Sequence, residues 1–120
     1  MITSRHFKES EFQRCVPACS LQDMQQSTMD KFDRARDIAG IPFIMTCAKR
    51  TSAWDKAKGR SGTGAHTTGH AGDIKCLADA TRWKIVNALI EAGFKRIGIA
   101  KTYIHADDSP NHTQEVIWLY

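Results

Sequence analysis

The chain has 120 residues, enough for one modest hydrophobic core, so we expect a single domain over residues 1–120. Apolar residues make up 42% and charged residues 25% of the chain, as is ordinary for a soluble fold, and no apolar run approaches the roughly 18 residues that cross a bilayer. The net charge of +4 favours anionic partners such as nucleic acid, anionic lipid or an acidic wall polymer.

The first residues, Met1 to Lys8, lack the basic and then apolar layout of a signal peptide. We therefore expect synthesis in the cytoplasm and reduced thiols at the four cysteines. Cys15 and Cys19 have a three-residue gap and no matching second pair, so they support a structural zinc site only weakly. Cys47 and Cys76 lie in apolar, strand-like surroundings and are expected in the core.

Apolar residues recur every three or four positions after Ser20, which predicts an amphipathic helix over 21–39 that opens with a capping box. Gly40 tolerates a left-handed cap and Pro42 cannot continue a helix, so both end it. The apolar, β-prone run that follows predicts a buried strand over 42–48.

Residues 49–65 form a polar, glycine-containing connection with one possible helical turn at 53–58. A connection this long inside a compact domain is more often functional than idle. It carries Lys49, Arg50, Lys56, Lys58 and Arg60 against one acid, Asp55. A solvated basic loop is the commoner explanation of such a run, and contact with an anionic substrate is the alternative.

A second strand is expected over 70–76, followed by a helix that Asp79 caps and Gly93 ends. The apolar stripe expected on that helix consists of Trp83, Val86, Leu89 and Ile90. Three short extended segments close the chain, at 96–100, 102–106 and 115–120. Because helices and strands are segregated, we predict an α+β fold with two main helices and a small, mainly antiparallel sheet.

Three residues are candidate metal ligands: His66, Asp73 and His105. A catalytic zinc ion takes three protein ligands of these types and leaves a fourth position open. Each residue also has a plainer explanation, since a buried aspartate often meets arginine or backbone amides and a core histidine is often only hydrogen-bonded. Asp107 shares a strand face with His105, so it could be a general base, a partner of a metal ligand, a substrate anchor or a strand-end carboxylate.

Two short motifs carry a resemblance to a known family. They are His66-x-x-Gly69-x-Ala71-x-Asp73-Ile74 and Ile104-His105-x-Asp107. Their combination resembles the zinc D-Ala-D-Ala carboxypeptidase family of peptidoglycan peptidases, especially its short members among phage lysis proteins and bacterial wall hydrolases. The run from Thr46 to Thr51 is similar to the family strand that ends in Ser-Gly-Tyr-Arg, and the resemblance covers nearly the whole chain.

The resemblance implies that His66, Asp73 and His105 bind Zn²⁺, and that Arg50 grips a carboxylate or carbonyl of the substrate. A surface ion pair is the other explanation for Arg50. The implied activity is hydrolysis of peptide bonds in peptidoglycan stem peptides or cross-links, as a carboxypeptidase or an endopeptidase. Asp107 is assigned as the catalytic base because Thr102 stands where many relatives carry Glu, Asp or His, and threonine cannot accept a proton at neutral pH.

Four further departures from the family pattern lie in or before the metal motif: Lys49, Asp55, Arg60 and Gly64. They make the loop next to the site more charged. Two other functions stay open: a zinc-binding module on the same fold that has lost catalysis, and a basic nucleic-acid-binding domain, which charge alone suggests. We expect a monomer whose partner is a peptidoglycan peptide, with no nucleic acid and no membrane insertion, acting at the bacterial wall or periplasm if it is of phage origin.

Overall fold

The computed structural model describes residues 1–120 and contains five strands in one sheet. The elements are α1 (Glu9–Gln13), η1 (Leu21–Asp23), α2 (Gln26–Ala39), β1 (Met45–Cys47), α3 (Ser52–Ala57), η2 (Ala65–Thr68), β2 (Ala71–Lys75), α4 (Asp79–Ala92), β3 (Arg96–Ile99), β4 (Tyr103–Asp107) and β5 (Val116–Leu119), where η marks a 3-10 helix. The strand order is β1-β2-β4-β3-β5, with only β3 and β5 parallel. The predicted α+β fold with a mainly antiparallel sheet is therefore confirmed.

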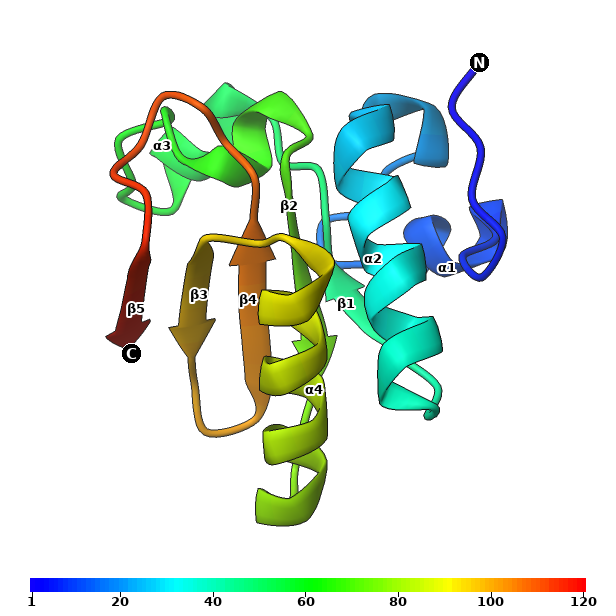
Figure 1. Ribbon diagram of the computed structural model, residues 1–120. Coiled ribbons are helices and arrows are strands. Elements are labelled where there is room, and N and C mark those ends of the chain that lie inside the picture. The colour runs from blue at the N-terminus through cyan, green and yellow to red at the C-terminus, as the bar shows by residue number, and fades with distance from the viewer.

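Helices α2 and α4 pack against each other and lie on one face of the sheet (Figure 1). Because side chains alternate along a strand, Ile74, Ile104 and Ala106 point into the core beneath these helices. The intervening residues of β2 and β4, including Asp73 and His105, point to the opposite face. The sheet thus separates an apolar layer from a layer that bears the candidate site.

Helix α2 begins five residues later than predicted. The capping box at Ser20 and Asp23 is present, but it caps the start of η1 rather than the start of α2. Met24 follows in an extended conformation with ψ 160° and is only 2% exposed, so it leaves the helical path to reach the core. The end of α2 is as predicted, because Gly40 adopts a left-handed conformation with φ 68°.

Helix α4 has the predicted extent, but its predicted apolar stripe is only half right: Leu89 is buried and Val86 packs against the core, whereas the other two residues face solvent. Trp83 is 74% exposed and Ile90 48% exposed. The buried positions are Ile85, Ala88, Leu89 and Ala92. These lie three or four residues apart on the face toward the sheet and α2, where alanines allow close helix contact. Asp79 is the first residue of α4 and pairs with Arg82 at 2.6 Å instead of capping the helix.

The predicted strands before and after α4 are confirmed, with ends that differ from the prediction by at most three residues. The connection over 49–65 contains α3 and leads into η2. Both helices lie at the edge of the sheet where β2 begins (Figure 1). The segment after β4 is fixed to α2, since the Asp108 carboxylate accepts hydrogen bonds from Ser27, Thr28 and Lys31. These two irregular segments shape the end of the sheet where the candidate site lies.

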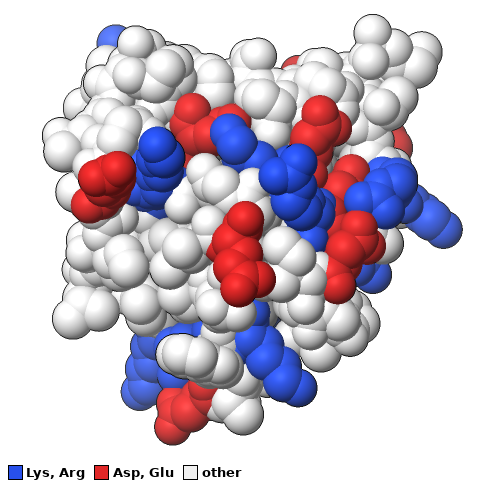
Figure 2. All heavy atoms as spheres, in the orientation of Figure 1, with Lys and Arg blue, Asp and Glu red and all other residues white.

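No helix in this structure combines the length and the apolar character that crossing a membrane requires. On the face shown in Figure 2, which lies over α2 and α4, basic and acidic side chains are interspersed. Helix α2 contributes to two ion pairs, between Asp37 and Arg5 at 2.5 Å and between Lys31 and Asp108 at 3.0 Å. The positive net charge therefore forms no continuous basic stripe on that face.

Candidate metal centre

The candidate site is a row of residues that crosses the sheet at one level. Asp73 of β2 is directly opposite His105 of β4, which in turn is opposite Gly98 of β3. Residues opposite each other on neighbouring strands place their side chains on the same face. Asp73 and His105 therefore converge because of strand register, although 32 residues separate them in the chain.

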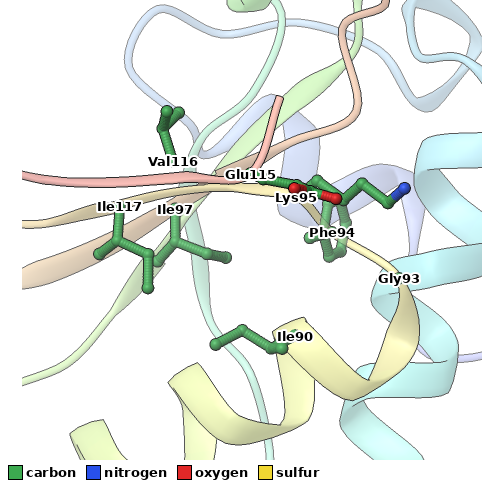
Figure 3. Close-up of a pocket in the computed structure, with 8 residues that line it drawn as sticks. All are labelled: Ile90, Gly93, Phe94, Lys95, Ile97, Glu115, Val116 and Ile117. Atoms are coloured by element: carbon green, nitrogen blue, oxygen red, sulfur yellow. The ribbon is translucent and has the colours of Figure 1, made fainter. Parts of the chain in front are cut away.

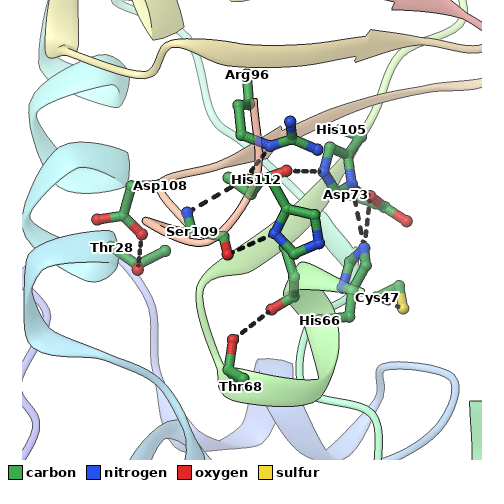
Figure 4. Close-up of polar contacts among 12 residues, drawn as sticks. Thr28, Cys47, His66, Thr68, Asp73, Arg96, His105, Asp108, Ser109 and His112 are labelled. Atoms are coloured by element: carbon green, nitrogen blue, oxygen red, sulfur yellow. Dashed lines mark hydrogen bonds and ion pairs between the residues drawn. The ribbon is translucent and has the colours of Figure 1, made fainter. Parts of the chain in front are cut away.

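His66 joins this pair from η2, and the three side chains form a nearly equilateral triangle (Figure 4). His66 Nε2 lies 3.2 Å from His105 Nδ1 and 3.2 Å from Asp73 Oδ1. His105 Nδ1 lies 3.1 Å from the same Asp73 oxygen. All three residues are buried, with 3%, 8% and 5% of their surface exposed for His66, Asp73 and His105.

The outer hydrogen bonds fix which nitrogen of each ring is free. His66 Nδ1 lies 2.5 Å from the carbonyl oxygen of Ala48, which can only accept, so Nδ1 carries the proton and donates it. The backbone N–H of Arg50 in turn donates to the His66 carbonyl at 3.0 Å. The lone pair of His66 Nε2 consequently points toward Asp73 and His105.

Asp107 does the same for His105. Its Oδ2 lies 2.6 Å from His105 Nε2, so that nitrogen donates and His105 Nδ1 is free. Its Oδ1 accepts from Arg96 Nε at 2.7 Å and from the Ser109 backbone N–H at 3.2 Å. Asp107 is fully buried and lies beyond the His105 ring, on the side opposite the triangle. Among the roles considered for it, this geometry favours orientation of a ligand; its assignment as the base stays a prediction.

The pKa values reflect this arrangement. Burial alone would lower the pKa of His66, but its interactions with Asp73 and Cys47 outweigh burial and raise it. Burial likewise opposes the rise in the pKa of His105, which Asp107 and Asp73 produce. The pKa of Asp73 is far below its usual range despite its burial, because both imidazoles stabilise the carboxylate. The triangle therefore favours a bound cation, either protons or a metal ion.

A metal ion of the size of zinc fits the triangle. Zinc binds histidine nitrogen and carboxylate oxygen at about 2.0–2.2 Å, so two ligand atoms of a tetrahedral site lie about 3.3–3.6 Å apart. The three observed separations, between 3.1 and 3.2 Å, are close to that spacing. His66, Asp73 and His105 would thus be the ligands, and each imidazole already has the hydrogen-bonded outer partner typical of metal sites.

Arg50 lies beside the centre but is held in a buried ion pair. Its Nε is 2.9 Å from Asp55 Oδ1, and the two side chains are 14% and 2% exposed. Neither atom makes a well-aligned hydrogen bond, so the contact is electrostatic. The guanidinium carbon lies 5.9 Å from the Trp54 ring centre, and Nη1 lies 3.8 Å from Cys47 Sγ. The structure therefore brings Arg50 to the site, while its role in gripping substrate stays a prediction.

A polar pocket of about 430 Å³ lies between η2, which carries His66, and the segment after β4. It is lined by Gly62, Thr63, Thr67, Thr68, Ser109, Asn111 and His112. Ser109 Oγ and His112 Nδ1 are 2.8 Å apart, which ties the segment after β4 together (Figure 4). Such a lining offers hydrogen-bonding groups for a peptide backbone. Thr102 lies instead in the exposed turn before β4, at the opposite end of the strand from Asp107.

Two residues near the centre were not predicted as part of it. Arg96, opposite Asp107 on β3, holds the carboxylate that orients His105, and only the strand register could have indicated this. Cys47 was expected in the core; it is 8% exposed, but it faces the metal centre. The register shifts between Met45 and Cys47, so Met45 opposes the core residue Ile74 while Cys47 opposes Asp73.

The structure also has an apolar hollow of about 340 Å³ between the end of α4 and strands β3 and β5 (Figure 3). Its lining residues are Ile90, Gly93, Phe94, Lys95, Ile97, Glu115, Val116 and Ile117. Ile97 points to the helix-covered face, since its neighbour Gly98 opposes His105 on the other face. The hollow is thus separated from the metal centre by the sheet.

Comparison with known proteins agrees with the geometry. No match to the chain is found among curated proteins. A family model described as Peptidase M15 matches residues 5–107, a range that includes His66, Asp73, His105 and the orienting Asp107. Because this match spans most of the 120 residues, the chain belongs to the peptidase M15 family.

Proposed function

We propose that this protein is a zinc-dependent peptidase that hydrolyses peptide bonds in bacterial peptidoglycan. The observation that carries the proposal is the triangle of His66 Nε2, Asp73 Oδ1 and His105 Nδ1, with separations of 3.1–3.2 Å. Three free lone pairs at this spacing in a buried site suit one small divalent cation. Membership of a peptidase family supports hydrolysis of a peptide bond as the reaction.

Zinc, when bound, supplies Lewis acidity that makes water nucleophilic near neutral pH and polarises a carbonyl group. The protein's own residues prepare that chemistry. Ala48 and Asp107 hold the two imidazoles with their free nitrogens toward Asp73. Arg96 and the Ser109 amide hold Asp107, so the orientation of His105 depends on two layers of hydrogen bonds.

The substrate would reach the centre along the polar pocket between η2 and the segment after β4. Hydroxyl groups of Thr67, Thr68 and Ser109 line it and suit the amide groups of a stem peptide. The cations of the 49–60 segment support an acidic polymer as substrate. Lys58 and Arg60 flank the Trp54 ring at 5.3 and 5.7 Å, so they form a cationic and aromatic surface next to Arg50. Action at the bacterial wall, with release from a phage-infected cell as one route, belongs to this proposal.

A non-catalytic zinc module is the second candidate, and one observation favours it. The potential ligand atoms of Cys47, His66 and Asp73 all lie within 4.8 Å of one another. A fourth protein ligand would close the site, as in structural zinc centres.

The test is digestion of purified peptidoglycan, followed by mass spectrometry of the released fragments. We expect peptide fragments that are lost when a chelator removes the metal and return when zinc is added. Release of the last residue of a stem peptide would identify a carboxypeptidase. Cleavage at an internal peptide bond would identify an endopeptidase. A fully zinc-loaded protein that releases nothing from any wall preparation would contradict the proposed activity and favour the non-catalytic module.

A further inference from the structure

We propose that Cys47 is a fourth, displaceable ligand of the metal centre. This inference rests on the proposed zinc site. It goes beyond the three predicted ligands and concerns how the open position of that site is controlled. A centre closed by the Cys47 sulfur would have to release it before water could bind.

Strand register places Cys47 next to the centre. Cys47 of β1 is directly opposite Asp73 of β2, as Asp73 is opposite His105 of β4. The three residues therefore form consecutive members of one row on one face of the sheet. The register shift before Cys47 turns its side chain away from the core and onto this face.

The sulfur lies beside one of the proposed metal-binding side chains. Cys47 Sγ is 3.9 Å from His66 Nδ1, the ring nitrogen that donates to Ala48 and not the one that faces the metal, and 3.8 Å from Arg50 Nη1; the thiol forms no disulfide. By contrast, the sulfur atoms of Cys15, Cys19 and Cys76 hydrogen-bond to backbone carbonyl groups, and those of Cys15 and Cys19 also interact with each other. Cys47 is thus the cysteine whose sulfur meets the polar groups of the site.

The distances allow coordination after a small movement. The possible ligand atoms of Cys47, His66 and Asp73 all lie within 4.8 Å of one another. Zinc–sulfur and zinc–oxygen bonds of about 2.3 and 2.1 Å put the two atoms of a tetrahedral site about 3.6 Å apart, so the sulfur and the Asp73 oxygen would have to approach each other by no more than about 1.2 Å. Coordination forms a metal–sulfur bond, breaks the bond between the metal and one water molecule, and releases the thiol proton to solvent.

Cobalt substitution tests this directly, because a cysteine sulfur bound to Co²⁺ gives an intense charge-transfer absorption in the near ultraviolet. The full chain would be stripped of metal, kept reduced and loaded with one equivalent of Co²⁺. We expect this absorption in the unmodified protein and in Cys19→Ser, whose sulfur lies 3.8 Å from the Phe12 carbonyl oxygen and contacts none of the three proposed ligands. We expect it to be absent in Cys47→Ser and Cys47→Ala, which should also release zinc faster to a chelator.

The outcomes separate this inference from the proposed function. The unmodified protein could bind one equivalent of Co²⁺, lose this binding in His66→Ala, and yet show no charge-transfer absorption. That result would overturn the role of Cys47 and leave the three-ligand centre standing. The same absorption in Cys47→Ser would also overturn it. Failure to bind Co²⁺ at all would overturn both proposals. If the thiol competes with water, Cys47→Ser should in addition cleave peptidoglycan with a higher initial rate than the unmodified protein.

Discussion

Asp73 on β2 and His105 on β4 are opposite each other in an antiparallel pair, and Asp73 Oδ1 lies 3.1 Å from His105 Nδ1. A shift of one residue in this pairing would turn one of the two side chains to the core face. The metal centre therefore depends on the sheet, and its third member, His66, depends on the hydrogen bond from its ring to Ala48.

Replacing any one of the three proposed ligands should remove zinc. We expect His66→Ala, Asp73→Ala and His105→Ala each to reduce zinc to well below one equivalent, because the protein ligands that remain do not hold the ion against buffer. Elemental analysis of the purified variants measures this. His6→Ala is the matched control, since His6 pairs with Asp37 on α2, away from the centre. Full zinc content in His66→Ala would contradict the assignment.

Asp107→Asn distinguishes the two roles considered for this carboxylate. If Asp107 orients His105, zinc affinity should fall by about 10- to 100-fold, as for other partners of metal ligands. If it takes a proton in the reaction, turnover should fall by at least about 100-fold while zinc affinity stays unchanged. From its burial and its 2.6 Å contact with His105 we expect the first result. Chelator competition and turnover at saturating zinc measure the two quantities separately.

Separating the buried pair of Arg50 and Asp55 should destabilise the fold. Removing one partner leaves the other charge buried, which costs about 3–5 kcal/mol in comparable pairs. We expect Asp55→Ala to lower the free energy of unfolding by an amount in that range, and Arg50→Ala combined with Asp55→Ala to lower it by less than the sum of the single changes. Urea denaturation measures this. Additive losses would show that the 2.9 Å contact carries no coupling.

Gly98→Ala should disturb the aromatic side of the centre. A Cβ at Gly98 would lie 2.7 Å from atoms of Trp118 and from Tyr120 Cε2, so the rings must move. Trp118 also packs against His105, with ring centres 5.3 Å apart. We expect a loss of about 1–3 kcal/mol, typical of overpacking, together with altered tryptophan fluorescence. Gly64→Ala is the control, because the nearest neighbour of its Cβ is 3.9 Å away; equal losses in both would contradict the argument.

As the pH rises, the stability of the metal-free protein should fall while the stabilisation by zinc should grow. The pKa values of His66 and His105 are raised in the fold, so in metal-free protein their contribution is complete below about pH 6.5 and is lost as the pH rises through the folded values. The Tm in a chelator should therefore fall above that pH. Zinc binds the deprotonated imidazoles, so the increase in Tm that zinc produces should grow over the same range. Parallel profiles with and without zinc would contradict this.

Several features were predictable from the sequence because they follow from local chemistry. The end of α2 at Gly40, the extent of α4 and the strands around it depend on caps, breakers and short apolar runs. The candidate ligands His66, Asp73 and His105 stood out because their residue types and motifs are specific. The start of α2 could not be predicted, since the burial of Met24 outweighs the capping signal at Ser20.

The surroundings of the metal centre were decided by tertiary structure. The sequence by itself determined which residues have metal-binding chemistry and that an α+β fold would hold them. Strand register alone brought Asp73 opposite His105 and Arg96 opposite Asp107. A register shift in β1 turned Cys47 from the core toward the metal ligands, and the regular alternation of side chains along a strand does not predict such a shift. Such pairings join residues far apart in the chain, so only the packed sheet fixes which atoms meet.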